Sequence, residues 1–170
     1  MESLIRSLLA AVRKETSILD SLVQLGYEKK QLIIRNQFRE LDTLVQKEGI
    51  VVSGLQRAED ARFKLQGELA QTWDILPEDL TATVLTTRLQ MEEFSAASDA
   101  EQALLELNKA AKQLQSINKD NQELTNYALD YLDYLLTMMQ GDVAGIYSEN
   151  GREAEERSFR PARQLLDRIV

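Results

Sequence analysis

Apolar residues recur at seven-residue intervals along the longest uninterrupted segment of the chain, from residue 104 to residue 139. One lane consists of Leu104, Ala111, Asn118, Thr125, Leu132 and Met139, and the other of Leu107, Leu114, Asn121, Ala128 and Leu135. This spacing predicts a long helix whose two lanes face a neighbouring helix. Asn118 and Asn121 occupy positions where Leu or Ile would stabilise a bundle most, so their amides need partners if they are buried.

Two interpretations of this asparagine pair follow from its spacing. The favoured one is a buried, hydrogen-bonded polar layer that fixes the register of the helices. The alternative is that Asn118 and Asn121 form a polar element in an exposed groove where another molecule docks. Neither residue has a catalytic partner of the usual kind, because the chain contains no His and no Cys.

Two further long helices are predicted before this segment, over residues 2–35 and 37–71. The apolar stripe of the first is Ile5, Leu8, Leu9, Val12, Thr16, Leu19, Leu22, Val23 and Ile33, and that of the second is Leu41, Leu44, Val51, Leu55, Ala58, Leu65 and Leu69. Gly26 is a weak point in the first helix. Asn36 is a turn residue between them, and so tight a connection predicts an antiparallel hairpin.

Residues 72–98 form the predicted crossover to the long helix. Pro77 suits the first turn of a shorter helix over residues 78–94. Ser98 and Glu101 have the spacing of a capping box, so we expect the long helix to begin at Asp99. Gly141 is the expected C-terminal stop, after residue 139 or 140.

The C-terminal segment differs from the body in its charge. Residues 148–170 contain five acidic residues and five arginines, so the whole formal charge of −8 lies in residues 1–147. We expect a mobile tail that ends in a short amphipathic helix, with Leu165, Leu166 and Ile169 on one face. A frayed terminus is the alternative.

The predicted fold class is therefore all-α. It is an elongated antiparallel bundle of three long helices plus a shorter crossover helix, and it carries a mobile C-terminal tail. The predicted division is a helical bundle over residues 1–147 and a flexible, partner-binding tail over residues 148–170. No apolar run approaches the ~20 residues needed to cross a bilayer, and the amphipathic N-terminus is expected to be the start of a helix rather than a signal peptide.

The composition narrows the function. Without Cys and His, disulfides, thiolate nucleophiles and the commonest metal ligands are excluded. We expect no cofactor, no metal site and no enzymatic activity. A pI near 4.7 makes nucleic acid and anionic membranes poor partners.

Three other groups of residues are candidates for functional sites. The acidic pairs Glu92–Glu93 and Asp130/Asp133 are interpreted as a solvated face, since no further ligands have metal-site spacing. Tyr127, Tyr131 and Tyr134 lie about one turn apart, which is typical of core or core edge, with partner binding as the alternative. The basic candidates for a helical enzyme of the chorismate mutase type are Arg57, Arg62 and Arg88, and nothing in the sequence arranges them.

Several segments together resemble the FlgN family of flagellar export chaperones. They are the hairpin of two long helices, the stretch LQSINKDNQELTNYALDYLDYLL, the segment YSENG and the ending LLDRIV. The asparagine pair matches the family's N-x-x-N pair, and Tyr147 to Gly151 match its Tyr–small–x–x–Gly segment. The similarity covers essentially the whole chain, and the order of its parts carries it more than any single motif.

The resemblance implies a function that periodicity alone does not. FlgN-like chaperones bind the C-terminal helical region of hook-associated proteins of the hook–filament junction (FlgK and FlgL type) in the cytoplasm. They keep these proteins unassembled and deliver them to the type III export gate (FlhA type). Carried over to this chain, cargo binding falls on Leu165, Leu166 and Ile169, and export-gate docking on Tyr147. Ser148 replaces a Gly found in some members, which weakens the match at that position.

Such a role also agrees with the physical properties of the chain. An acidic helical bundle can cover an amphipathic cargo helix. A tail that becomes ordered only on binding loses conformational entropy, which permits release of the cargo. The alternative function is a coiled-coil structural or tethering protein without an export role. A homodimer is compatible with either function.

Overall fold

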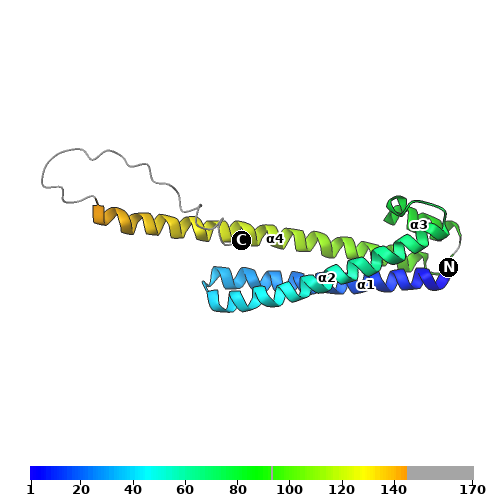
Figure 1. Cartoon of the computed structure of the whole chain (residues 1–170), viewed down its shortest axis with the longest axis horizontal. Helices are drawn as coiled ribbons and strands as arrows, with labels where there is room; N and C mark the ends of the chain where they lie inside the picture. Colours follow the sequence, from blue (N-terminus) through cyan, green and yellow to red (C-terminus); the bar gives the residue numbers. More distant parts are fainter. Residues whose placement is uncertain (93, 145–170) are drawn as a thin grey trace. The chain divides into compact units, whose positions relative to one another are not determined.

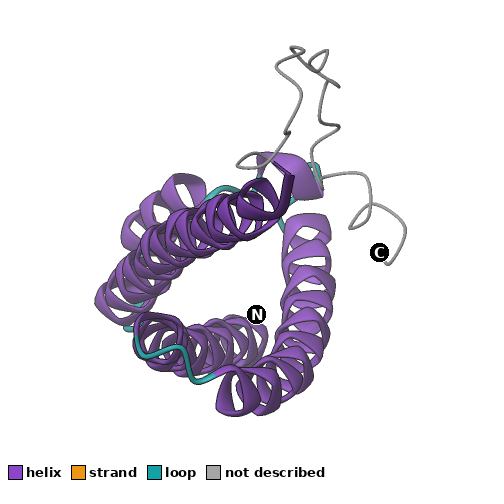
Figure 2. Ribbon diagram, turned by 90° about the vertical axis from the view of Figure 1, so that its left-hand side faces the viewer, coloured by secondary structure: helices purple, strands orange, loops and turns teal. Residues whose placement is uncertain are grey.

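The computed structural model describes residues 1–92 and 94–144, with side chains described up to residue 139. Within these residues the chain forms the α-helices α1 (Glu2–Ile34), α2 (Phe38–Thr72), α3 (Ala82–Met91) and α4 (Ala97–Ala144), and the 3₁₀ turn η1 (Pro77–Asp79). Figure 2 shows only helix and loop in this part of the chain, so the all-α prediction is confirmed. The chain divides into two compact units, Met1–Leu124 and Thr125–Val170.

The predicted tail lies outside the described residues. This applies to the boundary after residue 147, to the segment 148–170 and to its short terminal helix, all of which stay predictions.

Helices α1 and α2 form the predicted antiparallel hairpin, side by side in Figure 1. Asn36 supports the turn with a φ of 55°, a left-handed conformation that Asn tolerates better than most residues. Lys29 pairs with Glu48, and Glu15 with Arg62. From Lys29 to Glu15 the chain moves back 14 residues, while from Glu48 to Arg62 it advances 14, as an antiparallel register requires.

The core of the first unit consists of two clusters. The larger one joins residues of all four α-helices, with Ile5, Leu9, Leu69 and Leu89 among its most buried members. A smaller one surrounds Leu22, Leu25 and Leu44. Every predicted position of the α1 stripe is buried except Thr16, which is half-buried, and every position of the α2 stripe is buried or half-buried.

The crossover helix begins later than predicted. Pro77 opens η1, and α3 starts only at Ala82, where the Thr81 hydroxyl accepts a hydrogen bond from the Val84 amide (3.3 Å). Between them Leu80 is buried in the core with 5% of its surface exposed. Because burial of Leu80 fixes an irregular turn, a helix cannot run on from Pro77.

Both predicted ends of the long helix were wrong. Helix α4 begins at Ala97, and the Ala100 amide already donates to the Ala96 carbonyl, so Ser98 lies inside the first turn and does not cap it. The helix also continues through Gly141 to Ala144. A single Gly weakens a helix by only ~1 kcal/mol, so a glycine by itself does not have to end one.

Only one of the two predicted lanes of α4 faces the first unit's interior. Leu107 and Leu114 are half-buried and Asn121 is buried, as predicted. In the other predicted lane only Leu104 packs against the core, where it is half-buried. The fully buried positions lie one residue earlier, at Ala103, Ala110 and Ile117, while Ala111 and Asn118 are exposed. The placement of Asn118 in the buried seam was therefore wrong.

Helix packing explains why the buried lane lies one residue before the predicted one. Positions three and four residues before Leu107 both flank it on a helix, so either can complete an inward face. Alanine at 103 and 110 lets α4 approach its neighbours more closely than a leucine would. Close approach maximises contact in an interior packed at crystal-like density.

Helix α4 comes nearest to α1 at Gly26. A Cβ atom at this position would lie 2.9 Å from Cγ2 of Ile117, closer than real Cβ atoms come to other atoms, and 3.1 Å from Cγ1. One turn further along α4, the Asn121 amide nitrogen donates to the Gly26 carbonyl oxygen at 2.8 Å. Salt bridges from Arg13 to Asp99 and from Lys30 to Asp120 lie on either side, so α4 runs in the same direction as α1.

We predict that Gly26→Ala lowers the free energy of unfolding, although Ala favours helix. The methyl group would overlap Ile117, and overpacking typically costs about 1–3 kcal/mol against about 1 kcal/mol gained in helix propensity. Gly54→Ala is the control, because a Cβ there meets nothing within 4 Å. Urea denaturation should give a lower midpoint for Gly26→Ala and a raised one for Gly54→Ala; the same rise for both would contradict the close contact.

We also predict that the two asparagines differ in their effect on stability. Asn121→Ala removes a buried donor from the Gly26 carbonyl and should cost about 1–3 kcal/mol. Asn118→Ala changes an exposed side chain and should stay within about 0.5 kcal/mol of the parent. Thermal unfolding followed by circular dichroism measures both, and equal losses would show that the pair acts as one buried layer.

Candidate functional site

The part of α4 that belongs to the second unit exposes a dense set of large apolar side chains. The exposed fractions are 72% for Tyr127, 44% for Leu129, 61% for Tyr131, 47% for Leu132, 58% for Tyr134, 51% for Leu136, 52% for Met138 and 71% for Met139. We call these eight residues the α4 apolar surface. So concentrated an exposed apolar patch marks an interaction site in a soluble protein.

The α4 apolar surface is wider than one helix contact requires. At 100° per residue, the apolar positions between Tyr127 and Met139 cover an arc of roughly 220°, leaving Asp130, Asp133 and Thr137 on a narrow polar strip. A helix that buries one face against a core needs an apolar stripe of only about 100°. The excess width suits a partner that wraps around the helix or contacts it from two sides.

The tyrosines are exposed and do not belong to the core or its edge, so that prediction was wrong. Tyr127, Tyr131 and Tyr134 share one side of the helix with Met138. A tyrosine ring offers a large apolar face together with a hydroxyl that can stay hydrated, and methionine adapts its shape to the partner. This combination is typical of binding surfaces that accept more than one sequence.

Sequence reasoning missed the leucine and methionine half of this surface. The heptad pattern predicts an inward-facing position for Leu132, and it gives no binding role to Leu129, Leu136 or Met138. The width of the apolar arc was the signal available in the sequence, because a helix that is apolar over more than half of its circumference cannot bury all of it against one neighbour.

The remaining predicted site residues lie elsewhere. Leu165, Leu166, Ile169 and Tyr147 are outside the described residues. Asn121 is buried and bound to Gly26, which fits a structural role, whereas Asn118 is exposed. The two asparagines therefore lie in different environments.

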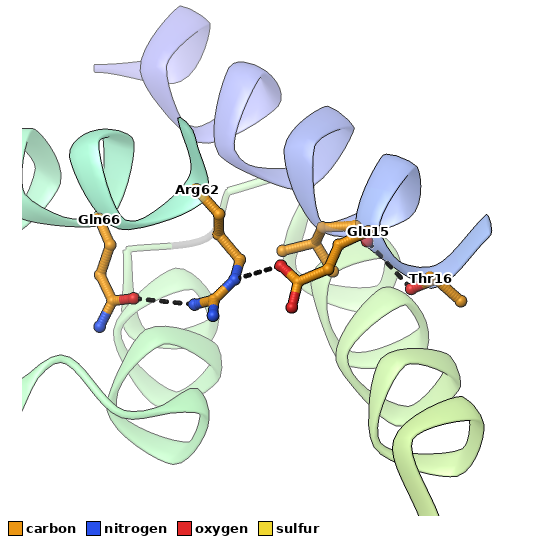
Figure 3. Close-up of polar contacts among 5 residues, drawn as sticks. Glu15, Thr16, Arg62 and Gln66 are labelled. Carbon is orange, nitrogen blue, oxygen red and sulfur yellow. Dashed lines mark hydrogen bonds and ion pairs between the residues drawn. The ribbon is translucent and has the colours of Figure 1, made fainter. Parts of the chain in front are cut away.

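The three arginines considered for an enzyme have different surroundings. Arg62 donates to the buried Glu15 carboxylate (2.5 Å) and to the Gln66 side chain (3.1 Å), as Figure 3 shows. Arg88 lies over the Trp73 ring and donates to the Trp73 carbonyl oxygen (3.3 Å). Arg57 is exposed. The contacts of Arg62 and Arg88 hold helices together and present no common cluster.

The described part of the chain gives little structural support for metal binding or for membrane insertion. Over residues 1–92 and 94–144, no group of three or more acidic side chains is placed to hold a metal ion. Asp130 and Asp133 are exposed, and Glu93 is outside the described residues. Among the helices that the structure describes, none combines the length and the apolar character needed to cross a bilayer.

Comparison with known proteins assigns the family. The model of the FlgN protein family matches residues 1–155, which includes the helical hairpin, the asparagine pair and the α4 apolar surface. No curated protein and no solved structure matches the chain. The order of helices, the N-x-x-N pair and the family match agree, and this chain belongs to the FlgN family, whose members are chaperones of flagellum biogenesis.

Proposed function

We propose that this protein binds the C-terminal helical region of hook-associated proteins of the hook–filament junction in the cytoplasm, keeps them unassembled, and delivers them to the type III export gate. Family membership supports the chaperone role in general. The observation that supports a cargo site is the α4 apolar surface, from Tyr127 to Met139. No energy source beyond binding is required, because covering and releasing a helix needs only a change of partner.

Cargo helices of this kind present an apolar face that otherwise packs against another helix. The α4 apolar surface can cover such a face by helix-to-helix packing. Eight large side chains, each more than 40% exposed, offer enough apolar area to drive the association. Asp130 and Asp133 on the polar strip keep this segment of α4 hydrated when no cargo is bound.

The C-terminal tail supplies the second half of the proposed cargo site. Leu165, Leu166 and Ile169 form one apolar face in the sequence, and they follow the α4 apolar surface by fewer than 40 residues. A segment that orders only on binding loses conformational entropy, which moderates affinity and allows cargo to leave at the export gate. Tyr147 lies between the two cargo-binding parts and is the proposed gate contact.

The first test addresses the α4 apolar surface. We expect Leu132→Asp combined with Met139→Asp to weaken binding of a peptide from the C-terminal region of a hook-associated protein by at least about tenfold, because two charges must be desolvated. Isothermal titration calorimetry measures the dissociation constant, and circular dichroism checks that helicity is unchanged.

Leu105→Asp is the matched control for this test. It places the same charge on the same helix at a leucine that is 70% exposed but lies in the first unit. Equal losses for Leu105→Asp and the double variant would mean that added charge alone weakens binding. Deletion of residues 148–170 tests the tail separately, and an unchanged dissociation constant after that deletion would remove the tail from the site.

A further inference from the structure

A cavity of about 340 Å³ lies in the first unit, where side chains from all four α-helices meet. Its apolar wall consists of Leu8 and Val12 of α1, Phe63 of α2, Leu85 of α3, and Leu104 and Leu107 of α4. Leu8, Val12 and Leu85 are buried, whereas Phe63 is 57% exposed, so a buried apolar floor opens to solvent beside the Phe63 ring. We call this cavity the crossover pocket, because η1 and the start of α3 complete its wall.

Hydrogen bonds hold the wall of the crossover pocket in place. The Gln66 side chain donates to the carbonyl oxygens of Pro77 (3.2 Å) and Leu80 (3.0 Å), and these bonds fix the crossover against α2. Gln66 in turn accepts from Arg62, which also donates to Glu15, as Figure 3 shows. A pocket whose wall is fixed in this way needs little rearrangement to bind a ligand.

The size and the lining of the crossover pocket restrict what it can bind. Ligand pockets usually have volumes of about 300–1,000 Å³, so this one is at the small end of the range. Its volume suits a large apolar side chain better than a nucleotide or another large cofactor. A Phe or Leu side chain that enters the pocket would contact leucines of three helices.

The charges at the pocket are acidic. Glu78 is part of the wall, and its exposed carboxylate, like that of Asp79, forms no ion pair with any described residue. Arg62 does not offset this charge, because it is paired with Glu15. Lys64 is the next basic residue on α2, and at 100° per residue it lies on the side of the helix opposite to Arg62.

The same acidity extends over the whole crossover. Residues 66–101 contain eight acidic residues and one basic residue, Arg88, so this segment carries −7 of the formal charge of −8. Among the acidic residues of this segment that the structure describes, only Asp99 forms an ion pair, with Arg13. A negative field of this kind attracts cationic groups and repels phosphate and other anions.

We propose that the crossover pocket binds a peptide segment of another protein in which a Phe or Leu stands next to a Lys or Arg. The apolar side chain fills the pocket, and the neighbouring cation lies beside Glu78. An anionic ligand would meet Glu78 and Asp79 as like charges, and an uncharged apolar ligand would gain nothing from either carboxylate. The pocket belongs wholly to the first unit, so this site goes beyond the cargo site proposed on the second unit.

The first experiment is a titration of the full chain with blocked dipeptides, followed by methyl NMR spectra. The probe is N-acetyl-phenylalanyl-arginine amide, and we expect it to shift the methyl signals of Val12, Leu85 and Leu104 with a dissociation constant on the order of 1 mM. A probe with alanine in place of phenylalanine should bind about tenfold more weakly or worse, because it leaves the pocket unfilled. A probe with glutamate in place of arginine should bind about threefold more weakly or worse, since attraction to Glu78 becomes repulsion.

Two outcomes of this titration would overturn the proposal. One is equal affinity for the phenylalanine and alanine probes. The other is a set of shifts confined to the methyl groups of the α4 apolar surface, such as those of Met138 and Met139, because the probe would then bind only there.

A charge variant tests the contact with the cation. Glu78→Lys should reverse the preference, so that the probe with glutamate binds more tightly than the probe with arginine. Glu68→Lys is the matched control, because it makes the same change in net charge at an exposed residue of α2 outside the pocket wall. It should change either affinity by less than about twofold. Equal effects of the two variants would reject Glu78 as the contact.

A filling variant tests the pocket itself. Ala82→Phe places a ring at the exposed rim of the wall, and it should weaken binding of the probe by about tenfold or more. Thr83→Phe adds the same ring at the next exposed residue, outside the wall, and should leave binding unchanged; circular dichroism checks that both variants fold. Unchanged binding to Ala82→Phe would overturn the proposal. Leu132→Asp with Met139→Asp should bind the probe normally, so this test does not depend on the proposed cargo site.

Discussion

The contact of Gly26 with Ile117 and Asn121 determines how α4 is rotated in the first unit. Glycine lets the two helices approach until Ile117 fills the space where a side chain would be. The Asn121 amide then reaches a backbone carbonyl of α1, a bond that forms at only one register. Once this contact is made, Ala103 and Ala110 face inward, and Ala111 and Asn118 face solvent.

A buried ion pair sets the register of the hairpin formed by α1 and α2. Glu15 is 5% exposed, and it is stabilised inside the first unit by Arg62, 47 residues away in the sequence. Such a pair adds little net stability, because desolvation offsets much of the attraction. It does penalise every alternative register, since a slipped hairpin would leave a buried carboxylate without its guanidinium. Lys29 and Glu48 repeat the arrangement nearer the turn.

Function in this protein rests on surfaces that stay exposed. The family to which the chain belongs is a family of chaperones, whose task is to recognise partner proteins. The α4 apolar surface has the width, the tyrosines and the methionines that suit binding of varied helical segments. The family match connects the protein with flagellum biogenesis, and the α4 apolar surface is the cargo site that we propose.

Much of the fold was predictable because its causes are local. The apolar stripes of α1 and α2 follow from helical periodicity, the turn at Asn36 from the tolerance of Asn for positive φ, and the family from the order of the segments. The late start of α3 was not predictable, because it depends on burial of Leu80 in a core built from distant residues. Burial of Glu15 likewise required Arg62, which periodicity does not connect to it.

The sequence by itself determined that the long helix forms and that Leu107, Leu114 and Asn121 face inward. Only the tertiary structure decided between Ala103 and Leu104 as the neighbouring lane, and it left the tyrosines of α4 exposed. The reason is physical: periodicity records which residues share a face, but burial depends on whether another element approaches that face. At Gly26 one helix does approach, whereas the eight side chains of the α4 apolar surface stay in solvent.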